Sequence, residues 1–165
     1  MKEDPTDFVA APIAEMMEMV LPNDANILGN ILGGKVMHLV DVCAATAAAR
    51  HCRRPVVTAS IDYLEFRYPI KVGELIIVKA ALNRAFRTSM EIGAKVWSEN
   101  LLTGERQHTS SAYLTFVALD ENGKPTMVPP YQPATPEETR RWHDANIRRE
   151  HRQAIRGRLS PRNKS

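Results

Sequence analysis

The feature that most constrains this fold is a helical stretch at residues 33–52 with small side chains on almost every side. Val36, Val40, Cys43 and Ala47 recur at helical spacing and form an apolar stripe. Five alanines between residues 44 and 49 place methyl groups around the rest of the circumference. Such a helix lets other backbones approach closely from several directions, which predicts that a sheet wraps around it.

Strand patterns lie on both sides of this helix in the sequence. A first strand is predicted over residues 13–21, and four more over residues 56–66, 74–83, 89–98 and 107–119. In the fourth of these five segments Met90, Ile92, Ala94 and Val96 share one face, and Glu91, Lys95 and Trp97 share the other. One strand, one helix and four antiparallel strands predict an α+β fold with a curled sheet, whose free edges invite pairing with a second copy.

The length of 165 residues fits one domain, which we place at residues 1–130. Residues 131–165 are expected to form a C-terminal helix, from Thr135 or Pro136 to about Arg156, and a disordered basic tail. Residues 137–165 hold nine Lys and Arg against four Asp and Glu, whereas the whole chain carries only +3. No aromatic interleaving or binding motif accompanies these charges, so a solvated helix is favoured over a nucleic-acid partner. With His143 and His151 as its only acid–base candidates, this helix is expected to be dispensable for chemistry.

The two cysteines, Cys43 and Cys52, predict neither a disulfide framework nor a metal site, because no CxxC or His cluster accompanies them. Two cysteines without a disulfide pattern indicate a reducing compartment. No run approaches the ~18 consecutive apolar residues of a membrane span. A cytoplasmic protein without a membrane partner is therefore expected.

The start of the long helix carries the candidate catalytic residues. Gly33 and Gly34 open it, so unpaired backbone N–H groups can point at an oxyanion. Asp41 projects ~140° from Val36, away from the core stripe, and is a candidate general base. Asn30 can orient a water or a carbonyl. Structural alternatives stay open at this point: the glycines also suit a tight helix entry, and a turn Asn and a helical Asp are common.

Six motifs in order then resemble one known family. They are Gly29–Gly34 (GNILGG), Met37–Asp41 (MHLVD), Ala47–Cys52 (AAARHC), Val57–Asp62 (VTASID), Ser89–Ile92 (SMEI) and Ala112–Val117 (AYLTFV). The chain resembles the HotDog-fold acyl-CoA thioesterases of the brain-type cytosolic acyl-CoA hydrolase family and their short bacterial relatives. The resemblance implies hydrolysis of fatty acyl-CoA to free fatty acid and CoA, without a metal or cofactor. It also implies dimers assembled as a hexamer.

The resemblance also assigns roles to residues. Many relatives carry Asp where this chain has Asn30, so the base here falls to Asp41, paired with the Asn of the opposite subunit. A water with a positioned base suffices to attack an activated thioester, and no GxSxG nucleophile motif is present. Gly33 or Gly34 would hold the oxyanion. The CoA candidates are Arg84, Arg87, Thr88 and Ser89 for the phosphates and Thr58 for the pantetheine channel. Arg84–Ser89 also suits an exposed hairpin end, and Thr58 a solvated strand face.

Other residues and functions remain as alternatives. His38 could assist the base, while Asp62 and Glu65 suit a cross-strand ion pair better than catalysis. A HotDog hydratase or dehydratase would need a His–carboxylate pair, for which only His38 and Asp41 qualify. A non-catalytic acyl-CoA-binding protein would bind acyl-CoA tightly without hydrolysing it.

Overall fold

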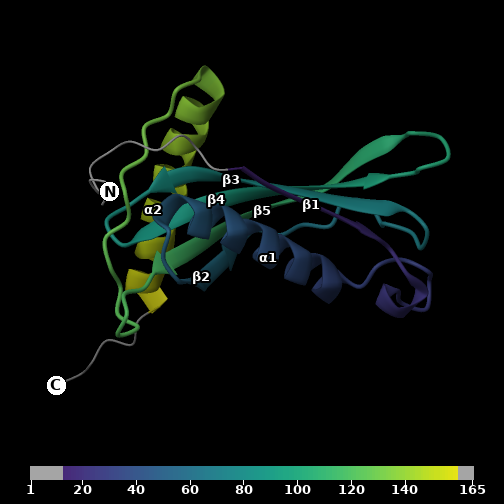
Figure 1. The fold of residues 1–165 in the computed structure, drawn as a ribbon, viewed down its shortest axis with the longest axis horizontal. Helices are drawn as coiled ribbons and strands as arrows, with labels where there is room; N and C mark the ends of the chain where they lie inside the picture. The colour runs from purple at the N-terminus through teal and green to yellow at the C-terminus, as the bar shows by residue number, and fades with distance from the viewer. Residues whose placement is uncertain (1–12, 160–165) are drawn as a thin grey trace.

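The computed structural model describes residues 13–159. Its elements follow the predicted order (Figure 1): β1 (Ile13–Met19), a 3-10 turn η1 (Pro22–Asp24), α1 (Gly33–Cys52), β2 (Val56–Asp62), β3 (Leu75–Ala85), β4 (Ser89–Glu99), β5 (Arg106–Ala118) and α2 (Pro136–Leu159). All strands pair antiparallel in one sheet of order β1-β3-β4-β5-β2. The predicted α+β architecture is confirmed.

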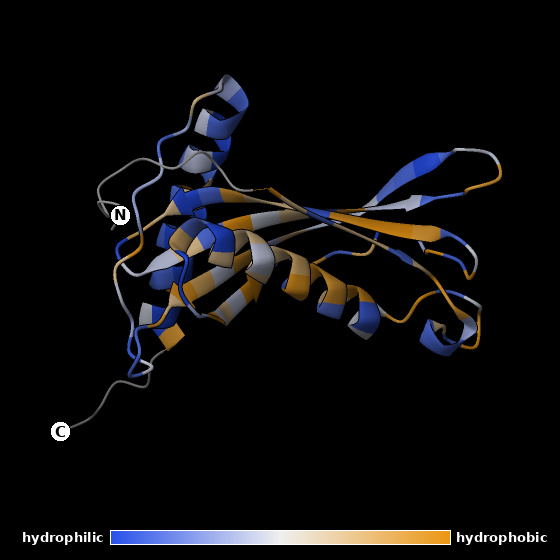
Figure 2. Ribbon diagram, viewed as in Figure 1, coloured by the Kyte–Doolittle hydropathy of each residue, from blue (hydrophilic) through white to orange (hydrophobic). Residues whose placement is uncertain are grey.

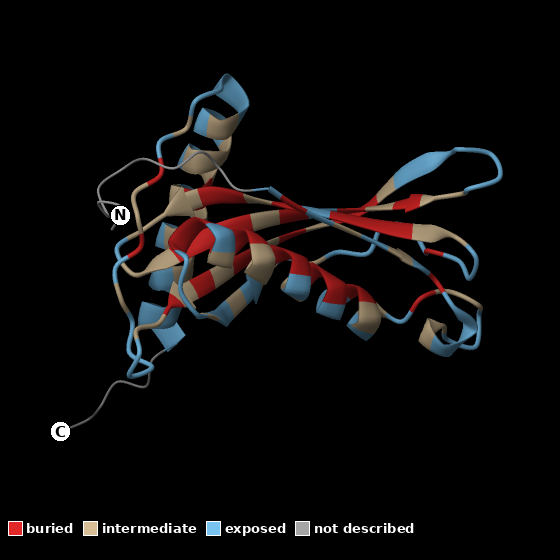
Figure 3. Cartoon of the chain, in the orientation of Figure 1, coloured by how far each residue is buried: buried red, intermediate tan, exposed pale blue. Residues whose placement is uncertain are grey.

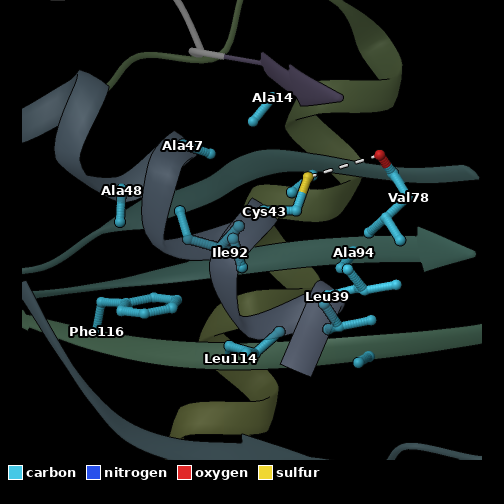
Figure 4. Close-up of a cluster of buried hydrophobic side chains, with 14 of the residues drawn as sticks. Ala14, Leu39, Cys43, Ala47, Ala48, Val78, Ile92, Ala94, Leu114 and Phe116 are labelled. Carbon is cyan, nitrogen blue, oxygen red and sulfur yellow. Dashed lines mark hydrogen bonds between the residues drawn. The ribbon is translucent and has the colours of Figure 1, made fainter. Parts of the chain in front are cut away.

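α1 packs against one face of this sheet and forms the core with it (Figures 3 and 4). Val40, Cys43, Ala44 and Ala47 have no exposed surface. They meet the even-numbered residues of β3, β4 and β5, such as Ile92 and Leu114, which are equally buried. The small side chains of α1 allow this close approach, as the sequence predicts.

α2 covers the opposite face of the sheet. Successive strand residues point to opposite faces, so Glu91 lies on the other side from Met90 and Ile92. Arg148 and Arg152 of α2 contact Glu91 there. Figure 2 shows that α2 is largely hydrophilic, whereas α1 carries many apolar residues. The expectation of a solvated C-terminal helix is therefore wrong in part, because arginines dock this helix on the sheet.

β2 is an edge strand, paired only with β5. Its ladder has a register shift between Thr58 and Ser60. Val57 and Ile61 leave 46% and 37% of their surfaces exposed, so apolar surface accompanies the unpaired strand edge. Such an edge is suited to pairing with another strand.

Most element boundaries differ from prediction by only one or two residues, and the ends of β2 and α2 differ by more. The first strand ends at Met19 rather than residue 21, and β2 ends at Asp62 rather than residue 66. Tyr63 takes a left-handed φ of 51°, which ends the extended strand there. α2 continues to Leu159 rather than about Arg156. The remaining part of the expected tail, residues 160–165, lies outside the described residues.

Candidate active site

Asp41 lies in the third turn of α1, on the side that faces β2. Its carboxylate accepts a hydrogen bond from the Thr58 hydroxyl, with Oγ1 and Oδ1 2.7 Å apart. Asp41 is half-buried, whereas Thr58 is exposed. The bond fixes one carboxylate oxygen and leaves the other free to accept a proton, as a general base requires.

The start of α1 offers free backbone donors. No side chain caps the helix, and within residues 13–159 the N–H groups of Gly33 and Gly34 make no hydrogen bond. A Cβ on Gly34 would meet nothing within 4 Å, so the space beside it is open. A Cβ on Gly33 would lie 3.4 Å from the Phe66 ring. The helix N-terminus can therefore bind an oxyanion beside Gly34.

These donors and Asp41 are too far apart to serve one thioester within a single copy. Asp41 follows Gly33 by eight residues, which is ~12 Å along a helix that rises ~1.5 Å per residue. A carbonyl under attack must lie within ~3–3.5 Å of both its water and its oxyanion donor. Combining these groups at one carbonyl thus requires a second copy of the chain.

The loop before α1 holds Asn30. The backbone N–H of Asn26 donates to the Asn30 carbonyl, 2.8 Å away, and Asn26 Oδ1 accepts from the N–H groups of Leu28 and Asn30. The Asn26 side chain thus shapes the loop through one of its two polar atoms. Within the described part of the chain, the Asn30 side chain and the Asn26 amide nitrogen make no hydrogen bond. Both amides are therefore available to a ligand.

The predicted CoA contacts lie at the turn between β3 and β4. Arg87 is exposed there, and the Ser89 hydroxyl accepts a hydrogen bond from Arg149 at 3.5 Å. Arg84 is engaged elsewhere, since its guanidinium stacks 3.5 Å from the centroid of the Trp142 ring. Burial, and then the nearby Arg149 charge, lower the pKa of Arg84. Within residues 13–159 the Arg87 guanidinium makes no hydrogen bond or ion pair, and Arg84 holds α2 to the hairpin.

Other nucleophiles have unsuitable surroundings. Burial raises the pKa of the Cys43 thiol to about 11, and burial also raises the pKa of Cys52. Neither thiol forms the reactive thiolate readily. Residues 13–159 contain no group of three side chains that could hold a metal ion.

The expected ion pair of Asp62 and Glu65 with a neighbouring strand is not formed. Asp62 pairs with Arg152 of α2, and Glu65 lies 3.3 Å from Arg67, two residues away in the same loop. Between the outer sheet face and α2 lies a cavity of about 280 Å³, lined by Lys95, Trp97 and Tyr113 among others. This cavity is on the opposite face of the sheet from Asp41.

Comparison with known proteins places the chain in a family. Residues 28–105 match the Thioesterase superfamily. YkhA of Bacillus subtilis, described as an uncharacterized acyl-CoA thioester hydrolase, is 41% identical over 82% of this chain and 83% of its own length. The rat cytosolic acyl coenzyme A thioester hydrolase is 33% identical over 82% of this chain, which spans 36% of that protein.

The chain belongs to the acyl-CoA thioesterases of the Thioesterase superfamily. A hexameric acyl-CoA thioesterase crystallised without ligand superposes with a TM-score of 0.84 at 43% identity, covering 91% of this chain and 94% of that one. The resemblance found in the sequence and the HotDog fold are thereby confirmed. None of the helices within residues 13–159 is both long and apolar enough to cross a bilayer.

An acyl-CoA hydrolase from Staphylococcus aureus, solved with butyryl-CoA, CoA and CoA disulfide, superposes with a TM-score of 0.81 at 34% identity. The superposition covers 87% of this chain and 88% of that one. The same enzyme has been solved with an Asn, an Asp and a Thr each replaced by Ala. The Asn precedes the Asp by fifteen residues, and the Thr follows it by seventeen.

Sequence reasoning misses the contact between Thr58 and Asp41. It predicts Thr58 in the pantetheine channel, because an isolated strand threonine has no local signal for a partner on a helix. Only the docking of β2 beside α1 brings the hydroxyl to the carboxylate. The roles of Asn30, Gly33 and Gly34 and of the CoA candidates stay predictions.

Proposed function

We propose that this acyl-CoA thioesterase hydrolyses fatty acyl-CoA to a free fatty acid and CoA, with Asp41 as general base. The hydrogen bond from Thr58 to Asp41 carries the proposal, because it orients an otherwise mobile carboxylate at an accessible surface. A positioned base of this kind contributes ~10²–10⁴-fold to the rate.

The reaction needs no covalent intermediate. Asp41 Oδ2 accepts a proton from water while the water oxygen attacks the thioester carbonyl. The oxyanion that forms accepts hydrogen bonds from the Gly33 or Gly34 N–H of a second copy, and one such donor is worth ~10²–10³ in rate. Collapse of the tetrahedral intermediate expels CoA as its thiolate, and the proton held by Asp41 passes to the products. No metal or cofactor is required in this scheme.

The amide that acts together with Asp41 is assigned from its spacing to Asp41 in the sequence. In this chain Asn26 precedes Asp41 by fifteen residues and Thr58 follows it by seventeen, as in the three replaced positions of the Staphylococcus aureus enzyme. This supports Asn26 beside Asn30 as a candidate to orient the water or the carbonyl. Asn26 has the added task of shaping its loop, whereas Asn30 has no side-chain bond to lose. Replacing each in turn separates the two assignments.

The CoA phosphates are proposed to bind Arg87, Thr88 and Ser89 at the β3–β4 turn, with Arg84 supporting the turn through Trp142. A guanidinium with no competing partner suits a phosphate. We also propose a homohexamer in the cytoplasm, built as a trimer of dimers and supported by the hexameric relative and by the cytosolic rat relative. The exposed apolar edge of β2 supports pairing of two copies there.

The experiment is a hydrolysis panel that runs from acetyl-CoA to palmitoyl-CoA, with release of the CoA thiol as the measured signal. Asp41→Asn and Thr58→Val serve as paired variants, and enoyl-CoA hydration is measured alongside. Thioester cleavage with long acyl chains, lost in Asp41→Asn, is the expected result. Tight acyl-CoA binding without turnover by the native protein would overturn the proposal, and hydration without cleavage would replace it.

A further inference from the structure

A wholly buried carboxylate lies where α2 meets the sheet. Glu91 has no exposed surface, and the guanidinium of Arg148 binds it through Nε at 3.1 and 3.2 Å and through Nη2 at 2.7 Å. Asn83 donates a further hydrogen bond at 3.0 Å. A Cβ at position 93 would lie 2.8 Å from the Asn83 amide, so Gly93 leaves the room this contact needs. α2 is thus fixed at one point by a charged, desolvated contact.

Arg152 lies one helical turn beyond Arg148 and connects this point to β2. Its guanidinium lies 3.5 Å from Glu91 and also binds Asp62, the last residue of β2. The side chains of Arg152 and Asp62 are only 18% and 26% exposed, so solvent screens their attraction less than at an open surface. The end of the edge strand is therefore held by α2.

The same strand carries Thr58, which faces the other side of the sheet. Residues four apart in a regular strand point to the same face, yet Thr58 bonds Asp41 of α1 and Asp62 bonds Arg152 of α2. The register shift between Thr58 and Ser60 explains this, because one extra residue reverses the facing of every strand residue after it. α1 and α2 thus contact β2 from opposite faces. α1 contacts it before the register shift, at Thr58, and α2 contacts it after the shift, at Asp62.

We propose that Arg152 is a positioning residue for hydrolysis: by holding Asp62 it fixes β2 at its bulge, and so aims the Thr58 hydroxyl at Asp41. Within one copy, β2 has a single neighbouring strand and an irregular ladder, and its end leads into Tyr63. The inference rests on the proposed role of Asp41. It also reverses the expectation that the C-terminal helix is dispensable for chemistry.

The effect should appear in kcat and not in KM, because the misplaced group acts on the reacting water and not on bound CoA. A displacement of ~1 Å can cost up to ~10²-fold in rate. The kcat of Arg152→Ala should fall by no more than that of Thr58→Val, through which it acts. Arg152→Lys, which keeps the charge, should recover part of the loss.

The test compares Arg152→Ala with Arg140→Ala, a matched control. Arg140 is also on α2, but its ion pairs are with Glu137 and Asp144 of the same helix. Arg152→Ala should lower kcat, Arg140→Ala should not, and Arg152→Ala should cause no further loss in a Thr58→Val background. If Arg152→Ala does not fold, Asp62→Asn, which keeps the side-chain shape, takes its place.

An unchanged kcat in the single variant, or an equal loss with and without Thr58, would overturn the inference. Assays well below each measured melting temperature separate positioning from unfolding. Failure of the proposed function is seen independently, since the native protein would then not hydrolyse acyl-CoA or Asp41→Asn would remain active.

Discussion

Removing Arg148 should destabilise the protein far more than removing an exposed arginine of the same helix. Arg148 neutralises Glu91, which has no exposed surface, and its guanidinium also stacks 3.6 Å from the centroid of the Tyr113 ring. Taking one partner from a buried ion pair typically costs ~3–5 kcal/mol. Arg152 at 3.5 Å and the Asn83 amide still face Glu91, so the lower end, about 3 kcal/mol, is expected for Arg148→Ala.

For a chain of this size, about 3 kcal/mol lowers the melting temperature by roughly 6–12 °C. Thermal and denaturant unfolding are measured at one fixed protein concentration, because assembly contributes to apparent stability. Arg140→Ala is the control and should barely shift the transition. Glu91→Gln combined with Arg148→Ala should recover part of the loss, since no charge is then left buried. A loss below ~1 kcal/mol for Arg148→Ala, as for a surface pair, would show that Glu91 does not depend on Arg148 for its burial.

Three further outcomes are expected from the site and the core. Asp41→Asn should lower kcat by ~10²–10⁴-fold and leave KM largely unchanged, and steady-state kinetics that show a near-native kcat would refute its role as base. Arg87→Ala should raise KM for acyl-CoA but spare a short thioester that lacks the nucleotide; equal damage to both substrates would indicate a structural role instead. Burial, partly offset by a hydrogen bond to the Pro129 carbonyl, lowers the pKa of His51 below its usual 6.5. The unfolded chain then binds a proton that the folded one excludes, so stability should fall as pH drops below about 6.5; His51→Gln should flatten this fall in melting-temperature series, and an unchanged slope would contradict it.

The central helix can be predicted from the sequence to the residue. Gly33 and the alanine-rich turns define where α1 begins and what can surround it, and Cys52 ends it where Arg53 takes a left-handed φ of 51°. The outer face of the sheet cannot be predicted in the same way. The strand pattern places Glu91 on the correct face, but its burial depends on Arg148, 57 residues later. No local sequence pattern predicts that Arg148 is the partner of Glu91.

In the candidate site, too, some residues can be predicted from the sequence and others cannot. Asp41 is identified by its angle to the apolar stripe, which is a property of one helix. Thr58 is predicted in a different role, because its contact with Asp41 depends on how a separate strand docks. The β2 bulge has no sequence signal of its own, yet it decides that Thr58 and Asp62 face opposite helices. Contacts of single side chains between elements, such as Thr58 with Asp41, are what the sequence does not predict.

The separation of Asp41 from the start of α1 implies that each active site is built from two copies of the chain. The direct measurement co-refolds Asp41→Ala with Asn26→Ala or with Asn30→Ala, using the Asn variant that is inactive alone. Random pairing makes about half of the dimers mixed, and each mixed dimer has one site with both native residues. Activity should recover to roughly a quarter of the native value with the Asn that serves the partner's site. No recovery with either Asn variant, with mixed dimers confirmed by mass spectrometry, would contradict a site built from two copies.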